Sequence, residues 1–198
     1  MTNMNAAVFL DRDGTLNEDV GYISRPGDLN LYPWAAEAVR AINKSGMKVI
    51  VVTNQSGVAR GFYTETELRI VHDKMSAELG QAGATMDAVY YCPHHPRFVD
   101  SPYGIECLCR KPKPGLLTLA AREHSIDLEA SFVIGDKWSD LELALNAGAT
   151  PVLVLTGYGR ETLARLEGGR FRPSIIASDL LGAVGDVLAQ RSRMRHRR

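Results

Sequence analysis

The chain lacks several features that mark whole classes of protein. No apolar run approaches the roughly 20 residues that a membrane-spanning helix requires, and the early run AAVFL is too short for the core of a signal peptide. Cysteine is scarce. The 198 residues contain three cysteines, all between positions 92 and 109, and this argues against a disulfide framework. We therefore expect a cytoplasmic protein without a membrane partner.

The chain also lacks net charge and has few aromatic residues. Lysines and arginines number 23, aspartates and glutamates also number 23, and aromatic residues make up 7%. Neither property favours nucleic-acid binding. The exception is the C-terminal segment RSRMRHRR, whose five arginines could bind RNA or lipid head groups, but which we expect to be a disordered, solvated tail. The expected organisation is a monomer with one domain over residues 1–190 and a tail over 191–198.

Short β-branched runs alternate with stretches that have apolar residues at helical spacing. The strand-like runs cover residues 6–10, 49–53, 88–91, 132–134, 151–155 and 174–176. The helix-like stretches cover residues 33–44, 64–79, 115–124 and 139–146, and Asp179 can cap a last helix. This alternation predicts an α/β fold with a Rossmann-like parallel sheet and helices on both faces. Ligands bind at the carboxyl ends of the strands in such sheets.

Two aspartates follow the first predicted strand in the segment DRDGT. Residues two apart in extended backbone point to the same side, so we expect Asp11 and Asp13 to share a face while Arg12 points away. Gly14 lets the chain turn directly afterwards. Two carboxylates this close repel each other unless a cation lies between them, which predicts a hard metal ion with oxygen ligands. The alternative is a solvated turn.

Polar residues also follow the later strands. The second strand ends at Thr53, and the next residues carry amides or a hydroxyl that can bind phosphate oxygens: Asn54, Gln55 and Ser56. Prolines stiffen the loop RKPKPG, so a lysine of this loop, Lys111 or Lys113, can be held opposite a transferring phosphoryl group. The fourth strand ends in Asp136, a third carboxylate for magnesium, and Asp140 is expected to orient Lys137. Each segment alone could be a polar turn, a surface loop or a helix cap.

All three cysteines lie in one irregular loop with histidines. Cys92-Pro-His94 is followed, after twelve residues, by Cys107-Leu-Cys109. Two close pairs separated by a short loop are typical of a tetrahedral zinc site, and four protein ligands make it structural. The spacing favours His94 over His95 as the fourth ligand, and free or redox thiols are the alternative. A zinc-stabilised loop over residues 92–110 would hold Arg110 and Lys111 in place.

The strand-end segments, taken in order from position 11 to 140, resemble the four motifs of the haloacid dehalogenase superfamily. The resemblance implies an aspartyl-phosphate mechanism with Asp11 as nucleophile and Asp13 as general acid and base. It assigns Thr53 and Lys111 to the transferring phosphoryl group. It also implies a Mg²⁺ ion, with ligands at Asp11, Asp13 and Asp136.

The zinc loop narrows the resemblance to sugar-bisphosphate phosphatases that have no separate cap domain. These imply removal of the 7-phosphate of D-glycero-D-manno-heptose 1,7-bisphosphate, on a route to lipopolysaccharide or another heptose glycoconjugate. The matching substrate-binding positions are Asp19, Val20, Gly21, Tyr22, Asn54, Gln55, Ser56, Arg110 and Lys137. A guanidinium at Arg110 can grip the distal phosphate with two hydrogen bonds.

Two other functions compete with this one. Histidinol-phosphate phosphatase shares the motifs and a similar zinc loop, but it often carries a second catalytic domain for which this chain has no room. Arg110 also suits a second phosphate better than a cationic histidinol. A zinc-loop nucleic-acid-binding protein with an inactive core is the rival from another class, and the acids at 11, 13 and 136 argue against it.

Overall fold

Six parallel strands form one sheet in the computed structural model, which describes residues 4–166, 169 and 171–195. The strands are β1 Ala7–Leu10, β2 Lys48–Asn54, β3 Ala88–Cys92, β4 Phe132–Gly135, β5 Thr150–Val154 and β6 Ile175–Ala177. Their order across the sheet is β3-β2-β1-β4-β5-β6. The chain builds outward from β1 to β3 and then returns to place β4 beside β1. The carboxyl ends of β1 and β4 therefore flank the switch point at which such sheets bind ligands.

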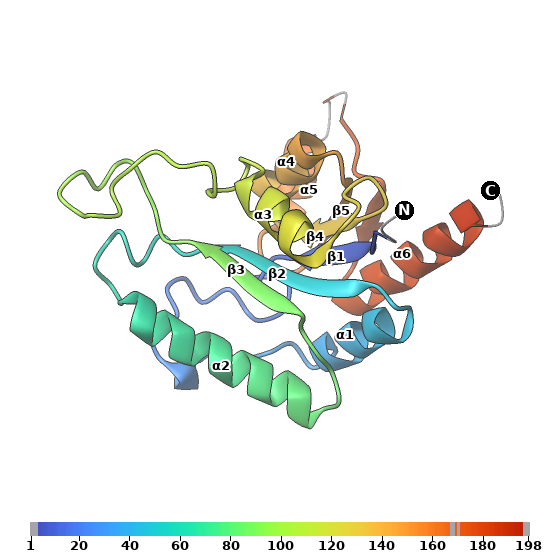
Figure 1. Ribbon diagram of the computed structural model, residues 1–198, viewed down its shortest axis with the longest axis horizontal. Coiled ribbons are helices and arrows are strands. Elements are labelled where there is room, and N and C mark those ends of the chain that lie inside the picture. Colours follow the sequence, from blue (N-terminus) through green and yellow to red (C-terminus); the bar gives the residue numbers. More distant parts are fainter. Residues whose placement is uncertain (1–3, 167–168, 170, 196–198) are drawn as a thin grey trace.

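Helices cover both faces of the sheet (Figure 1). One face carries α1 Ala35–Lys44, α2 Glu65–Gln81 and α6 Leu180–Arg195; the other carries α3 Gly115–His124, α4 Trp138–Ala147 and α5 Gly159–Leu166. Alternation along β1 explains both layers, because Val8 and Leu10 pack into the first core while Ala7 and Phe9 pack into the second. The predicted α/β architecture is confirmed.

The local signals in the sequence account for most helix starts. Thr64 forms the predicted capping box with Glu67, whose backbone N–H donates to the Thr64 hydroxyl at 3.2 Å. Asp179 caps α6 by accepting from the Gly182 N–H at 2.9 Å. The first helix begins at Ala35, later than the predicted residue 33, after a turn in which the Ala35 N–H donates to the Tyr32 carbonyl.

Two helices differ from expectation. The sequence did not predict α5, which has only eight residues and begins at a glycine. The last helix continues to Arg195, past the residue 190 at which we expect the domain to end. Arg191 donates from Nη1 to the Ser45 carbonyl at 3.2 Å, which ties this part of the predicted tail to the end of α1. Residues 196–198 lie outside the described residues.

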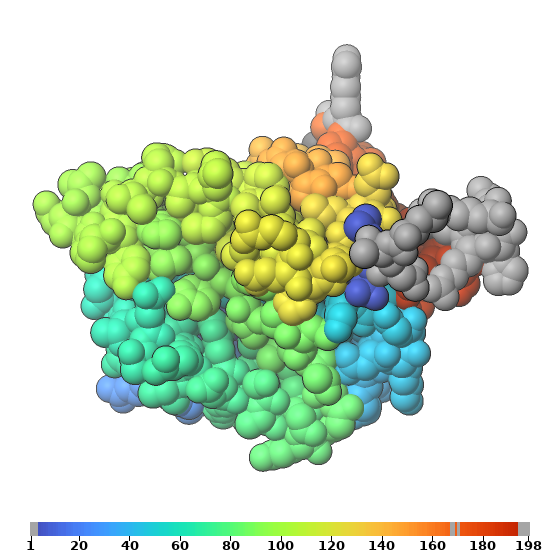
Figure 2. Space-filling view, in the orientation of Figure 1, coloured from blue at the N-terminus to red at the C-terminus, as the bar shows by residue number. Residues whose placement is uncertain are grey.

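The longest excursion after β3 is the cysteine-rich loop, which stands out beside α2 as the yellow-green projection on the left of Figure 2. Together with the loop between β1 and α1, it lies on the carboxyl side of the strands. No separate cap domain interrupts the sheet in the described residues. None of the helices described is long and apolar enough to cross a membrane.

Candidate active site and metal centres

Lys111 lies between two carboxylates at the carboxyl edge of the sheet. Its Nζ is 2.7 Å from Asp11 Oδ1 and 2.7 Å from Asp140 Oδ1, and it donates to the Val52 carbonyl at 3.0 Å. Burial alone lowers the pKa of Lys111, but the two carboxylates more than offset it and raise the pKa to about 12. The side chain is therefore a fixed cation beside Asp11.

Asp11 follows β1 and is almost fully buried. Burial raises its pKa, but the charges of Lys111 and Lys137 together outweigh burial and hold the pKa of Asp11 below its usual range. An ionised carboxylate can act as a nucleophile, whereas a protonated one cannot. The two lysines thus keep Asp11 in the reactive form.

Asp136 carries a buried oxygen without a hydrogen-bond partner among the described residues. Its Oδ2 accepts from the Tyr158 N–H at 2.8 Å, whereas its Oδ1 accepts from no donor. Burial, followed by the charge of Asp11, raises the pKa of Asp136 to about 8. Carboxylate oxygens of Asp11, Asp136 and Asp140 lie within 4.8 Å of one another. An orphaned carboxylate oxygen in such a group fits a hard cation such as Mg²⁺.

Asp13 lies outside this carboxylate group. Arg12 donates to it from Nε at 2.9 Å and from Nη2 at 2.8 Å, and the side-chain amides of Asn17 and Gln55 each donate at 3.0 Å. Four donors match the lone-pair sites of an ionised carboxylate. The expectation that Arg12 points away is wrong, whereas the magnesium contact expected of Asp13 stays a prediction, because its side chain is not among the three carboxylates grouped above. The guanidinium folds back onto Asp13 and occupies both of its oxygens.

Three of the four polar residues from Thr53 to Ser56 form side-chain hydrogen bonds within the site. Thr53 Oγ1 accepts from Gln55 Nε2 at 2.8 Å. Asn54 accepts from the Lys111 N–H at 3.0 Å and donates to the Lys111 carbonyl at 3.2 Å, so it fixes the backbone that carries the lysine. Ser56 is half-buried and no hydrogen bond of its side chain is recorded among the described residues.

The segment 19–22 lies at the mouth of this site. Asp19 Oδ2 accepts from Lys137 Nζ at 2.8 Å, which ties the segment to the start of α4. Gly21 donates from its N–H to Asp19 Oδ1 at 3.0 Å, and Val20 and Tyr22 are exposed. Burial lowers the pKa of Lys137, but Asp11 and Asp136 raise it well above the usual range. The mouth therefore presents exposed side chains next to a buried, charged interior.

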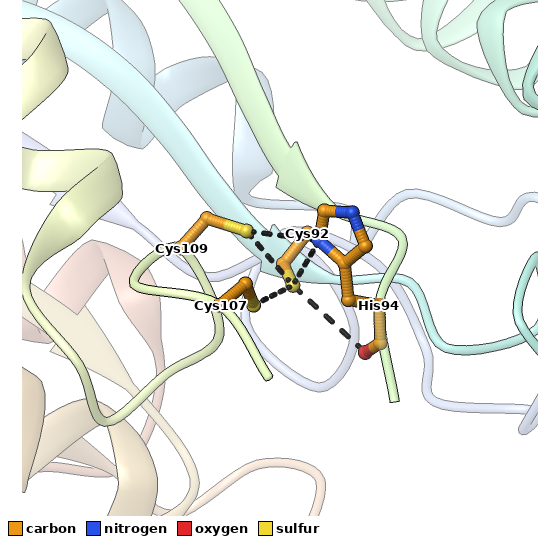
Figure 3. A group of neighbouring side chains, drawn as sticks. All are labelled: Cys92, His94, Cys107 and Cys109. Atoms are coloured by element: carbon orange, nitrogen blue, oxygen red, sulfur yellow. Dashed lines mark hydrogen bonds between the residues drawn. The ribbon is translucent and has the colours of Figure 1, made fainter. Parts of the chain in front are cut away.

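The four predicted zinc ligands converge at the base of the cysteine-rich loop (Figure 3). Cys92 Sγ lies 3.6 Å from Cys107 Sγ and 3.2 Å from Cys109 Sγ, and His94 Nδ1 lies 3.3 Å from Cys109 Sγ. All four ligand atoms fall within 4.8 Å of one another, a donor set that fits tetrahedral Zn²⁺. His95 is not in the group, because its Nδ1 accepts from the Arg97 N–H at 3.3 Å.

Arg110 and Lys111 follow directly after this cluster. Arg110 donates from Nη1 to the His94 carbonyl at 3.2 Å and is half-buried. The loop that carries the four ligands therefore also sets the position of Arg110, and the next residue is the lysine of the active site.

Comparison with known proteins identifies the family. The HAD-hydrolase-like family model matches residues 108–183. D-glycero-D-manno-heptose-1,7-bisphosphate 7-phosphatase of Thermosynechococcus vestitus is 43% identical over 182 residues, which are 90% of this chain and 93% of that protein. The chain belongs to the haloacid dehalogenase family of phosphatases. A heptose-bisphosphate phosphatase of Escherichia coli K12 is 42% identical over 76% of this chain and 80% of that protein.

A solved structure of this phosphatase family agrees with the fold. The D,D-heptose 1,7-bisphosphate phosphatase of B. bronchiseptica, crystallised with magnesium and phosphate, superposes with a TM-score of 0.83 at 35% identity. The match covers 93% of this chain and 99% of that one. The magnesium in that relative accords with the orphaned oxygen of Asp136.

Sequence reasoning missed several residues that complete this phosphatase site. Asp140 was expected to orient Lys137. Its Oδ2 does accept from the Lys137 backbone N–H at 3.0 Å, but its Oδ1 faces Lys111. Asn17 and Tyr63, which contact Asp13 and Gln55, carry no spacing signal because they come from loops. The sequence did single out Asp140, four residues after Asp136, but not its contact with Lys111.

Proposed function

We propose that the chain removes the 7-phosphate of D-glycero-D-manno-heptose 1,7-bisphosphate through a phosphorylated Asp11, with Mg²⁺ as cofactor and structural Zn²⁺. The observation that carries the proposal is the buried Lys111 ammonium, 2.7 Å from an ionised Asp11 at the switch point of the sheet. The substrate itself is proposed from relatives that carry the heptose-bisphosphate phosphatase name and are 43% and 42% identical.

In the first half-reaction, an Asp11 oxygen attacks phosphorus and the bond between phosphorus and the sugar oxygen breaks. The leaving alkoxide is a poor leaving group and takes a proton from Asp13. Asp13 accepts four hydrogen bonds in the free protein. When substrate binds, Asp13 takes up one proton from solvent in place of one of these donors, and this is the proton that it passes to the alkoxide. Lys111 remains beside the transferring group and balances its negative charge.

In the second half-reaction, water attacks the phosphorus of the aspartyl phosphate. Asp13, now a carboxylate again, takes the proton from that water. The bond between phosphorus and the Asp11 oxygen breaks, inorganic phosphate leaves, and the Asp11 carboxylate is restored. The neighbouring Arg12 guanidinium donates two hydrogen bonds to Asp13 and so orients its carboxyl group for this step.

The metal sites follow from the donor sets. Asp11 and Asp136 would hold Mg²⁺, which when bound neutralises charge on the phosphoryl oxygens. Cys92, His94, Cys107 and Cys109 would hold Zn²⁺ as a structural ion. Asp140 would stay with Lys111, since their charged atoms are 2.7 Å apart.

The second phosphate of the substrate would bind outside the carboxylate group. Arg110 is the proposed ligand for it, because a guanidinium binds phosphate oxygens in pairs and this one lies at the end of the zinc loop. The exposed Val20 and Tyr22, with Gly21, would contact the sugar. Monomeric state and cytoplasmic location stay predictions from the sequence, and light scattering on the purified protein tests the first.

Phosphate release by purified protein tests the proposal, with heptose bisphosphate and histidinol phosphate as paired substrates and Mg²⁺ added or withheld. We expect Mg²⁺-dependent turnover with a higher kcat/KM for the bisphosphate. Arg110→Ala should lower that kcat/KM while leaving turnover of a simple monophosphate ester unchanged. A higher kcat/KM for histidinol phosphate would reject the substrate and leave the phosphatase chemistry standing.

A further inference from the structure

The guanidinium of Arg12 is completely buried and contacts three side chains, those of Asp13, Gln55 and His72. Two of its hydrogen bonds go to Asp13, and Nη2 also donates to Gln55 Oε1 at 3.2 Å. The remaining contact joins Nη1 to His72 Nε2 at 3.1 Å. His72 comes from α2, 60 positions further along the chain. It lines an open groove of about 640 Å³ between α2 and β3.

The chemistry of arginine fixes the state of His72. Arginine has only donors, so Nε2 of His72 must accept and the ring proton must sit on Nδ1. Burial, reinforced by the charge of Arg12, lowers the pKa of His72 to about 3. The histidine is therefore a neutral, permanent acceptor for the guanidinium that holds Asp13.

Tyr63 supports Gln55, another side chain that donates to Asp13. Its hydroxyl donates to Gln55 Oε1 at 2.7 Å, and burial raises the pKa of Tyr63 to about 12, so the proton stays in place. Because Tyr63 and Arg12 both donate to the amide oxygen of Gln55, its NH₂ group must face Asp13 and Thr53.

We propose that His72 and Tyr63 are positioning residues, which hold the acid and base group Asp13 in place through Arg12 and Gln55. Among the described residues, no hydrogen bond joins either side chain to Asp11, Asp136, Asp140 or Lys111. Without the His72 acceptor, a buried donor of Arg12 loses its partner and the guanidinium can turn away from Asp13. This inference rests on the proposed role of Asp13 in proton transfer.

A comparison of substrates with different leaving groups can distinguish a positioning role of His72 and Tyr63 from a purely structural one. An alkyl phosphate needs a proton from Asp13 as it departs, whereas p-nitrophenolate leaves without one. Because kcat/KM reports the first half-reaction, we compare it for both esters in His72→Leu and in His72→Gln, whose side-chain oxygen can still accept. We expect His72→Leu to lose at least about ten-fold more on the alkyl ester than on the aryl ester, and His72→Gln to recover most of that loss. Tyr63→Phe should also lower kcat/KM more on the alkyl ester than on the aryl ester. Because it removes only a hydroxyl, this variant provides the test if His72→Leu does not fold.

Two further variants make the result decisive. Asp73→Asn changes an exposed residue of the same groove that does not reach Arg12, and should leave both values unchanged. Asp13→Asn removes the proton donor itself and therefore gives the largest difference expected between the losses of kcat/KM on the two esters. Equal losses on both esters in His72→Leu and Tyr63→Phe, beside a selective loss in Asp13→Asn, would overturn this inference alone. An unselective loss in Asp13→Asn would overturn the proposed acid role, and the inference with it.

Discussion

Lys111 Nζ lies 2.7 Å from Asp11 Oδ1, and both side chains are buried. The lysine serves two carboxylates at once, since Asp140 is equally close. Lys111→Ala should therefore leave two buried carboxylates without their cation and destabilise the protein by about 3 kcal/mol. Turnover should fall about a hundred-fold or more, because the transferring phosphoryl group loses its fixed positive charge. Denaturant unfolding and phosphate release measure the two effects.

Lys113 provides the matched control. It lies two residues further along the same loop, and its Nζ pairs with the exposed Glu106 at 2.7 Å. Lys113→Ala should leave turnover unchanged, because that surface pair does not reach the carboxylate group. Equal losses of turnover in Lys111→Ala and Lys113→Ala would mean that both act through the loop, and not through the Lys111 ammonium.

Asp11→Asn tests the nucleophile with little change in shape. The amide oxygen can still accept from Lys111, so the variant should fold. An amide cannot form the acyl phosphate, however, and turnover should fall at least about a thousand-fold. Acid quenching followed by mass spectrometry should detect a phosphorylated peptide containing Asp11 in the wild type and none in the variant. Turnover that survives the substitution would reject the covalent mechanism.

The fold and the charged ends of its strands could be predicted because both are local. Short β-branched runs define the strands, and Asp11 and Asp136 each follow one directly. The partners of Asp13 could not be predicted, because they depend on contacts between distant segments. Arg12 and His72 are 60 positions apart, and no spacing rule connects a strand end to the middle of α2. The expectation that Arg12 points away from Asp13 was wrong for this reason.

Asp136 should make the effect of Mg²⁺ depend on pH. Its pKa is raised from 3.8 to about 8 in the folded state. Folded protein therefore keeps a proton that unfolded protein releases. This contribution to stability is full below about pH 4 and is lost as the pH rises through about 8. Magnesium competes with the same proton, so the rise in Tm on adding Mg²⁺ should grow between about pH 6 and about pH 8.

Asp136→Asn is the control for this titration, because an amide does not ionise. The variant should show no magnesium-dependent rise in Tm at either pH. A rise in wild-type Tm that is equal at both ends of the range would contradict the role of Asp136 as the titrating ligand. Thermal scans in matched buffers, with Mg²⁺ or with a chelator, provide the measurement.

Zinc removal should weaken substrate binding without touching the carboxylate group. The cluster holds the loop that ends in Arg110 and Lys111, so His94→Ala should reduce bound zinc and lower kcat/KM for the bisphosphate at least about ten-fold. His95→Ala is the matched control and should keep its zinc, since His95 lies outside the cluster. Elemental analysis of the purified variants checks both. If His95→Ala loses its zinc and His94→Ala keeps it, then His95 and not His94 is the fourth zinc ligand.

Gly14 tests how closely the turn after Asp13 approaches the proposed metal ligand. Its φ is +88°, and a Cβ at this position would collide with the Asp136 carboxylate. Gly14→Ala should therefore combine backbone strain of about 1 kcal/mol with displacement of Asp136, and should weaken Mg²⁺-dependent turnover. Gly46→Ala shares the strain, since Gly46 has a φ of +74°, but a Cβ there meets nothing within 4 Å. We expect similar backbone costs but a loss of magnesium affinity only in Gly14→Ala, which activity measured against Mg²⁺ concentration would reveal. Equal magnesium affinity in the two variants would show that Asp136 can move aside at no cost, and would argue against its role as a fixed ligand.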